Sequence, residues 1–239
     1  MCGRYTHLFT WTQLHRLMEL TTPPTQLALR YNVAPTQIAP VVLAAKSERR
    51  LKMLRWGLVP SWAKSGAFGA RTINARSETV AGAPAFRAAF KQRRCLVPIS
   101  GFYEWEKRAE GQPKQPWYIT PMDDRPLALA GLWEEWGGGE ELIRSFTILT
   151  TSANTLMSPI HDRMPVILQP DRFGEWLDPG VEASDKVREL LVPCRSERLR
   201  AARVGSWVSS GAHQGARCIE PGIVPVGDEA GEGGLFGRT

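Results

Sequence analysis

The sequence has 239 residues, enough for one domain with a sizeable hydrophobic core. Its composition, 43% hydrophobic and 23% charged, is that of a soluble globular protein, and it holds no apolar run of the roughly 20 residues that span a bilayer. Lys and Arg outnumber Asp and Glu by 30 to 24, which favours a polyanionic partner. Because the first residues lack the pattern of a secretion signal, we expect a cytoplasmic protein without a membrane partner.

The apolar pattern predicts one helix near the N-terminus and mostly short strands after it. Thr10 is a typical N-cap residue, and apolar residues follow it at helical spacing up to Leu20, before Pro23 and Pro24. Short apolar runs separated by Pro, Gly and Asp are typical of strands. We expect such strands at residues 40–44, 51–58, 95–99, 102–107, 117–120, 127–133, 143–151 and 166–168.

Helical segments are expected between these strands, at residues 84–92, 153–157, 171–177 and 182–191. Many strands with scattered helices indicate the α+β class, as a single domain with a mostly antiparallel, barrel-like β core and peripheral helices. The last stretch is rich in Gly and acidic residues and has little to bury. We therefore expect the domain to span residues 1–221 and a disordered tail to span residues 222–239.

The chain contains four cysteines, at Cys2, Cys95, Cys194 and Cys218. They form no C-x-x-C pair, and no His/Cys cluster has the spacing of a zinc site, so we predict no metal, no cofactor and no disulfide framework. Cys95 lies in an apolar run and is expected to be a small buried residue.

Cys2 has a special position, because Met1 is removed efficiently before a small second residue. Its free α-amine and its thiol, with pKa values of about 8 and about 8.5, would then both be reactive near neutrality. Such a 1,2-aminothiol condenses with an aldehyde: the amine forms an imine, and the thiol closes it to a thiazolidine ring. Alternatively, either group can attack an amide substrate. The position alone also fits a cysteine without a chemical role.

Two polar runs carry further candidate residues. Asn74 can donate and accept hydrogen bonds, and Arg76 can pair with phosphate, although their run also fits a loop that caps the start of a helix. His161 is followed by an Asp and an Arg, just before Pro165 and a predicted strand. This setting suits a proton shuttle, but a lone histidine fits a structural role equally well.

The predicted strand at residues 102–107 carries a third candidate. Because side chains alternate along a strand, Phe102 and Glu104 lie on one side and Tyr103 and Trp105 on the other. A carboxylate among aromatic residues is partly desolvated, which raises its pKa and suits general acid–base catalysis. The alternative is a strand that faces solvent with ordinary glutamates.

Six motifs in this order together resemble the SRAP family, the SOS-response-associated peptidase domains. The motifs are M-C-G-R-Y at residues 1–5, R-Y-N-V-A-P at 30–35, W-G-L-V-P-S-W at 56–62, N-A-R-S-E-T at 74–79, R-R-C-L-V-P-I-S-G-F-Y-E-W at 93–105 and I-H-D-R-M-P at 160–165. The resemblance runs from Met1 to about Pro221. One departure is the run at residues 205–213, which lacks the Asn that family members usually carry there.

The resemblance implies a sensor and shield of abasic sites in single-stranded DNA, which forms a thiazolidine DNA–protein crosslink after Met1 is removed. It implies Cys2 as the crosslinking nucleophile, Asn74 in the pocket, Glu104 as acid and base, and His161 beside the opened sugar. It further implies DNA contacts, in chain order, by Arg4, Trp62, Arg76, Arg87, Trp105 and Arg163. The expected partner is single-stranded DNA with abasic sites, including sites at junctions, bound by a monomer in the cytoplasm and on the nucleoid.

The sequence is also compatible with other functions. Autoproteolysis and lyase-type cleavage are compatible with the family resemblance. An N-terminal-nucleophile amide hydrolase is an alternative, because class II glutamine amidotransferases also begin Met-Cys-Gly, although their later glutamine-binding motifs are not evident here. The charge and the nine tryptophans also fit a non-covalent binder of single-stranded DNA.

Overall fold

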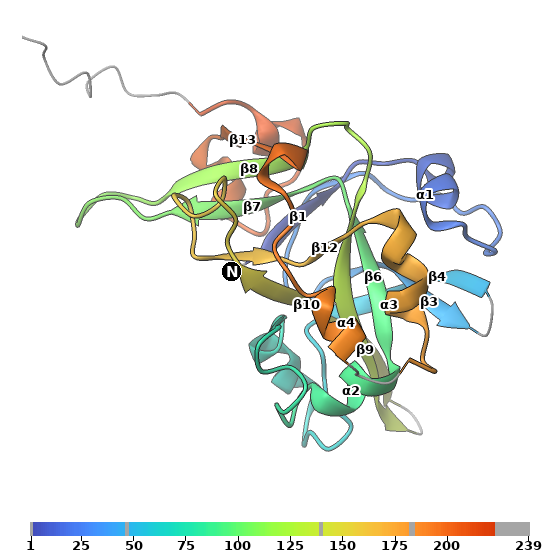
Figure 1. The fold of residues 1–239 in the computed structure, drawn as a ribbon. Helices are drawn as coiled ribbons and strands as arrows, with labels where there is room; N and C mark the ends of the chain where they lie inside the picture. The colour runs from blue at the N-terminus through green and yellow to red at the C-terminus, as the bar shows by residue number, and fades with distance from the viewer. Residues whose placement is uncertain (1, 46–47, 139–140, 182–184, 223–239) are drawn as a thin grey trace, which may run out of the picture.

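The computed structural model describes residues 2–45, 48–138, 141–181 and 185–222. The predicted tail at residues 222–239 lies outside the described residues apart from Gly222, and so does Met1. The chain forms two sheets with short helices around them (Figure 1). One sheet has the order β13-β8-β7-β1-β2, and all its pairings are antiparallel. Its strands are β1 (Arg4–His7), β2 (Arg30–Val33), β7 (Gly101–Glu106), β8 (Gln115–Pro121) and β13 (Leu199–Arg203).

The second sheet closes on itself. Its strands are β3 (Ile38–Ala45), β4 (Glu48–Trp56), β5 (Asn74–Arg76), β6 (Arg94–Ile99), β9 (Leu127–Gly138), β10 (Glu141–Ser152), β11 (Arg163–Pro165) and β12 (Ile167–Leu168). Because β10 pairs with both β9 and β4, the strands β10-β4-β3-β6-β9 form a closed barrel. The pairings of β10 with β4 and β5 are parallel, and the others are antiparallel. The predicted fold class is therefore confirmed.

The helices are short and lie at the periphery. They are α1 (Trp11–Met18), α2 (Arg87–Gln92), α3 (Phe173–Leu177) and α4 (Asp185–Glu189), with short 3-10 helices at η1 (Gly66–Arg71), η2 (Pro170–Arg172), η3 (Ser196–Arg198), η4 (Ser206–Ser209) and η5 (Ala216–Ile219). The first helix begins as predicted at Thr10, whose hydroxyl accepts from the Gln13 amide while the Gln13 side chain accepts from the Thr10 amide. None of the described helices is long and apolar enough to cross a membrane.

The helix predicted at residues 153–157 is wrong. Residues 155–160 form turns instead. The side-chain oxygen of Asn154 accepts a hydrogen bond from the Met157 amide at 2.9 Å, while its side-chain nitrogen donates to the Cys194 carbonyl at 3.0 Å. The contact with the Met157 amide is that of a helix N-cap, but the turns that it begins end at Ile160, before a regular helix forms.

The hydrophobic core contains two large clusters of buried side chains. One packs the helices on the barrel and includes Phe90 and Trp176. The other joins the two sheets: Tyr5 comes from β1, Trp56 from β4, and their rings lie 5.0 Å apart. Cys2 and Cys95 both belong to this second cluster and are fully buried, as predicted for Cys95. Cys2, two residues before β1, is thus built into the core rather than left at the surface.

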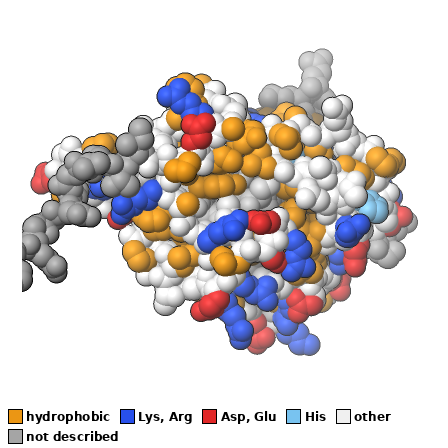
Figure 2. All heavy atoms as spheres, turned by 90° about the horizontal axis from the view of Figure 1, so that it is seen from above, with side chains coloured by type: hydrophobic (Ala, Val, Ile, Leu, Met, Phe, Trp, Pro, Cys, Tyr) orange, Lys and Arg blue, Asp and Glu red, His pale blue; other side chains and the backbone are white. Residues whose placement is uncertain are grey.

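Basic side chains are dispersed on the face shown in Figure 2, where Lys and Arg groups alternate with Asp and Glu around a band of hydrophobic side chains. Several arginines form exposed ion pairs, such as Arg125 with Asp123 at 2.6 Å and Arg144 with Glu135 at 2.6 Å. The net positive charge of the sequence is therefore not gathered into one continuous patch on that face.

Candidate active site

Cys2 is positioned by the strand that follows it. β1 lies between β2 and β7, and its antiparallel register with β7 pairs Arg4 with Tyr103 and Tyr5 with Phe102. Continuing this register places Gly3 opposite Glu104 and Cys2 opposite Trp105. The Cys2 side chain is fully buried, and burial, with a further contribution from the negative charge of Glu104, raises the pKa of its thiol far above the ordinary range. The thiol is therefore protonated at neutral pH.

Asn74 contacts Cys2 directly. It begins β5, a short strand that pairs in parallel with the middle of β10, so that Asn74 stands opposite Ile148. Its side-chain nitrogen donates a hydrogen bond to the main-chain carbonyl of Cys2 at 2.9 Å. Its side-chain oxygen is buried and has no hydrogen-bond partner among the described residues. The segment that the sequence suggested as a helix start is thus a strand, and its first residue holds Cys2.

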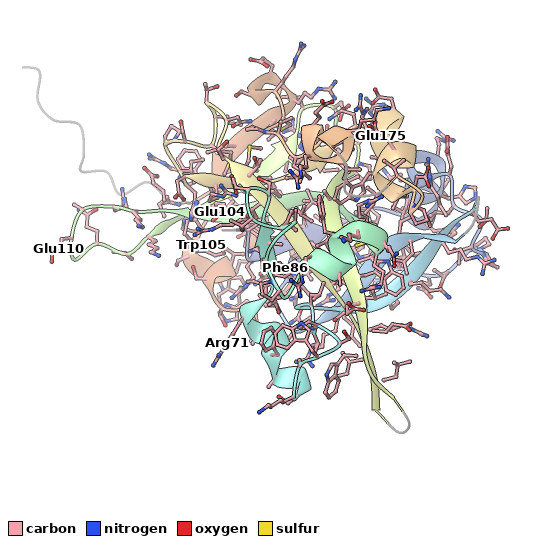
Figure 3. All side chains as sticks on the ribbon, turned by 60° about the horizontal axis from the view of Figure 1, so that its bottom comes forward. Arg71, Phe86, Glu104, Trp105, Glu110 and Glu175 are labelled. Atoms are coloured by element: carbon pink, nitrogen blue, oxygen red, sulfur yellow. The ribbon has the colours of Figure 1, made fainter. Side chains whose placement is uncertain are left out.

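Glu104 is a buried carboxylate at the centre of the site. Only 2% of the residue is exposed. Burial raises its pKa to about 7, and the charge of Asp162 acts in the same direction, while a hydrogen bond from the Trp105 backbone opposes the shift. The desolvated carboxylate predicted from the sequence is confirmed. Figure 3 shows Glu104 and Trp105 close together at the base of the β7–β8 hairpin, whose turn carries Glu110 far from the body.

His161 follows the turns at residues 155–160, and its amide donates to the Met157 carbonyl at 2.8 Å. Its ring nitrogen Nδ1 lies 3.0 Å from the Arg163 amide and 2.8 Å from the Asp162 carboxylate. Burial lowers the pKa of His161, and the positive charges of Lys107 and Lys114 add to this effect. The charge of Asp162 acts on both His161 and Glu104. The imidazole is therefore neutral near pH 7.

Two of the arginines predicted to bind DNA are engaged by their own chain. Arg4 donates to the side-chain oxygen of Asn32 at 3.2 Å and to the carbonyls of Val208 at 3.1 Å and Ser209 at 3.4 Å. Arg163 forms a bidentate ion pair with the carboxylate of Glu78. The other two predicted arginines are exposed: Arg76 ends β5, and Arg87 begins α2.

The two tryptophans predicted to contact DNA are partly exposed and anchored through their ring nitrogens. Trp62 is 56% exposed, packs edge-on against Phe68 with ring centroids 5.2 Å apart, and donates to the Pro84 carbonyl at 3.2 Å. Trp105 donates to the Ser209 hydroxyl at 3.1 Å. Both rings therefore present a fixed aromatic surface to solvent.

Asn32 was not predicted as a functional or structural residue. It holds residues 205–213, the segment that lacks the Asn expected there. Asn32 is fully buried on β2, and its side-chain nitrogen donates to the carbonyls of Val208, Ser210 and His213 at 3.2, 2.8 and 3.0 Å. The His213 ring in turn stacks on Trp207 at 3.5 Å. The motif R-Y-N-V-A-P contained Asn32, but nothing in the sequence showed that it contacts residues more than 170 positions away.

The described residues do not include three or more His, Cys, Asp or Glu side chains that converge closely enough to hold a metal ion. The groups that the site itself offers are a buried thiol, a carboxylate with a pKa near neutrality, a neutral imidazole and a carboxamide.

Comparison with known proteins identifies the class to which this fold and site belong. The family model described as SOS response associated peptidase (SRAP) matches residues 1–211, and the chain belongs to this family. The Bacillus subtilis protein named abasic site processing protein YoaM is 37% identical over 223 residues, which cover 92% of this chain and 98% of that protein. The Xenopus tropicalis protein named abasic site processing protein HMCES is 33% identical over 222 residues, which cover 79% of this chain and 65% of that protein.

Solved structures share the fold. A protein from Bacteroides thetaiotaomicron superposes with a TM-score of 0.82 at 24% identity, covering 93% of this chain and all of that one. A protein from Bordetella bronchiseptica superposes with a TM-score of 0.73 at 28% identity, covering 85% of this chain and all of that one. The single-domain arrangement of barrel, second sheet and peripheral helices is thus found in both.

Proposed function

We propose that this protein processes abasic sites in DNA and captures them covalently, through a thiazolidine formed between Cys2 and the aldehyde of an abasic site in single-stranded DNA. The observation that carries the proposal is the contact of Asn74 with Cys2 beside Glu104, a buried carboxylate whose pKa is about 7. The names of the relatives, which are 33% to 38% identical, support abasic DNA as the substrate.

The chemistry begins with the sugar. An abasic deoxyribose is a cyclic hemiacetal, and its C1′–O4′ bond must break to give the aldehyde, with a proton gained at O4′ and one lost from the C1′ hydroxyl. The Cys2 amine then adds to the aldehyde to give a carbinolamine, which loses water to an imine. Addition of the thiol across the imine closes the ring. The overall reaction joins protein and DNA with the release of one water molecule.

The amine and the thiol act at different stages. The thiol is protonated because burial raises its pKa, so it is a poor first nucleophile. The amine therefore attacks first, which requires that Met1 has been removed, because an amide nitrogen is not nucleophilic. The thiol then adds to the imine while Glu104 takes its proton. Holding all groups together makes each step effectively unimolecular, which supplies much of the rate.

The remaining groups have supporting roles in this proposal. Asn74 orients the Cys2 backbone, Glu104 transfers protons between the intermediates, and His161 gives a proton to O4′ as the sugar opens. The DNA itself lies along the exposed parts of the predicted contact residues, with Trp62 and Trp105 as stacking surfaces. Autoproteolytic removal of Met1 and lyase-type cleavage of the strand are secondary activities of the same groups. The protein acts as a monomer in the cytoplasm and on the nucleoid, with residues 1–221 as its functional domain.

A crosslinking assay tests this proposal. The protein is incubated with three single-stranded oligonucleotides: one with an abasic site, one intact, and one whose abasic site has been reduced to an alcohol. Only the first should give a conjugate that survives a denaturing gel. Cys2→Ala should abolish the conjugate, while Cys194→Ala, which removes a partly buried cysteine elsewhere, should leave it unchanged. Equal conjugate from Cys2→Ala and the unaltered protein would refute the proposal.

A further inference from the structure

Glu78 and Arg163 form the best-defined ion pair near the site. The two guanidinium nitrogens of Arg163 donate to the two carboxylate oxygens of Glu78 at 2.6 and 2.9 Å. The Arg163 side chain is only 15% exposed, and it also donates to the Thr150 carbonyl at 2.6 Å. A guanidinium fixed by two parallel hydrogen bonds and a carbonyl has one orientation, unlike an ordinary surface ion pair.

This pair connects the two segments that carry Asn74 and His161. Glu78 lies in the turn after β5, and the amide of Ser77 in this turn donates to the Thr150 carbonyl at 2.9 Å. Arg163 is the first residue of β11, on the opposite side of β10, and donates to the same carbonyl. The end of β10 is thus clamped between the turn that bears Glu78 and the strand that bears Arg163.

The backbone of Arg163 also contacts the ring of His161. Its amide donates to Nδ1 at 3.0 Å, and because a peptide N–H can only donate, Nδ1 must present its lone pair. In the neutral ring the hydrogen is then on Nε2. A competing contact favours the other tautomer: the Asp162 carboxylate lies 2.8 Å from the same Nδ1 and can accept a hydrogen from it. The Asp162 side chain is 87% exposed and solvated, whereas the Arg163 amide is held by its strand.

We propose that Glu78 is a positioning residue that sets the tautomer of His161. By clamping Arg163, it holds the Arg163 amide against Nδ1 and keeps the ring hydrogen on Nε2. Nε2 can then give its proton to O4′ while the C1′–O4′ bond of the abasic sugar breaks, and the proton that the C1′ hydroxyl loses returns to Nε2 through solvent, so that the ring stays neutral overall; this use rests on the proposed function. Without the clamp, Asp162 accepts the hydrogen bond from Nδ1–H, and Nε2 becomes an acceptor that cannot protonate O4′.

The tautomer of the His161 ring can be measured directly by NMR, in the absence of DNA. Nitrogen-15 spectra of the labelled protein, recorded at about pH 8 where the ring is neutral, distinguish the two forms by their nitrogen shifts and couplings to ring hydrogens. His161→Gln identifies the signals of His161 among the four histidines. We expect Nε2–H in the unaltered protein and a shift towards Nδ1–H in Glu78→Gln. The double variant Glu78→Gln/Asp162→Ala should return to Nε2–H, because the competing acceptor is gone.

A matched control is available in Glu175, which Figure 3 shows on α3, away from Glu104. Glu175 pairs with Arg172 at 2.8 Å, so Glu175→Gln removes one carboxylate from an arginine pair elsewhere. This variant should leave the His161 signals unchanged. Nδ1–H in the unaltered protein, or the same tautomer in Glu78→Gln as in the unaltered protein, would overturn the inference.

A kinetic measurement tests the consequence for chemistry. With an abasic site that must open its ring, Glu78→Gln should slow crosslinking by roughly tenfold or more, in line with loss of a general acid. With an acyclic aldehyde in the strand, which has no ring to open, the rate should equal that of the unaltered protein. Equal slowing on both substrates would show a merely structural defect and contradict the assigned role. If the unaltered protein formed no crosslink at all, the proposed function would fail, while the tautomer measurement would still decide the inference.

Discussion

The side-chain amide of Asn74 donates a hydrogen bond to the main-chain carbonyl of Cys2 at 2.9 Å. Asn74 belongs to β5, which is fixed to the barrel by β10, so the barrel determines where the backbone of Cys2 lies. This contact joins a rigid strand to the residue whose amine and thiol we propose to react.

Removing this hydrogen bond should affect chemistry more than folding. Asn74→Ala frees the Cys2 backbone, and because a displacement of about 1 Å can cost roughly 100-fold in rate, we expect crosslinking to slow by about 10- to 100-fold. The loss of one hydrogen bond should lower the free energy of unfolding by only about 1 kcal/mol. Single-turnover crosslinking and urea unfolding measure the two effects. Asn154→Ala, which removes a similar hydrogen bond to the Cys194 carbonyl at 3.0 Å, should keep the full rate.

The crosslinking rate should depend on pH through Glu104. Its pKa is about 7, so the carboxylate that accepts the thiol proton forms as the pH rises through neutrality. The rate should therefore show a step near pH 7, in addition to the rise that follows deprotonation of the Cys2 amine near pH 8. In Glu104→Gln the rate should be lower and this step in the profile should be absent. A profile with the same step in Glu104→Gln would assign it to another group.

The raised pKa of Glu104 also predicts how the free energy of unfolding depends on pH. Because burial raises the pKa of Glu104 in the folded state above its unfolded value, the folded state binds the proton more tightly, and this contribution is lost as the pH rises through about 7. Relative to the unaltered protein, Glu104→Gln should therefore gain stability between about pH 5 and about pH 8, on the order of 3 kcal/mol. Urea unfolding of both proteins at the two pH values measures the difference. A constant difference would mean that the carboxylate is not desolvated.

Asn32 should be important for stability. Its buried side chain donates to three carbonyls in residues 208–213, and Asn32→Ala would remove this shared donor from all three. We expect a loss of about 1–3 kcal/mol in the free energy of unfolding. The same change releases an acceptor of Arg4, so susceptibility of the 205–213 segment to limited proteolysis should also increase. Unchanged proteolysis would show that the other contacts of this segment, such as the Trp207–His213 stack, hold it without Asn32.

Much of the fold could be predicted from local pattern. The helix at Trp11–Met18 has a clear cap, and the longer strands have continuous apolar runs, so both were recognised. The strands β1, β2, β5, β11 and β13 were not, because they are short and form through pairing with distant partners. A strand such as Arg4–His7 has no local signal that distinguishes it from a loop.

The candidate site was predicted in its residue types but not in its contacts. The carboxylate of Glu104 could be expected to be desolvated because aromatic residues flank it in sequence. The contact between Asn74 and Cys2 depends on sheet pairing across more than 70 residues, and no local pattern encodes it. Arg163 was predicted to contact DNA, but its binding to Glu78 depends on how β5 and β11 flank β10.

The covalent bond itself tests the central claim most directly. The conjugate formed with abasic single-stranded DNA is analysed by intact mass and by sequencing of the attached peptide. We predict the mass of the chain without Met1 plus that of the DNA minus one water molecule, with attachment at the amine and sulfur of Cys2. A variant with Ala inserted between Met1 and Cys2, which moves the thiol away from the terminal amine, should form no such conjugate. Attachment at a lysine, or at a chain that retains Met1, would contradict the account.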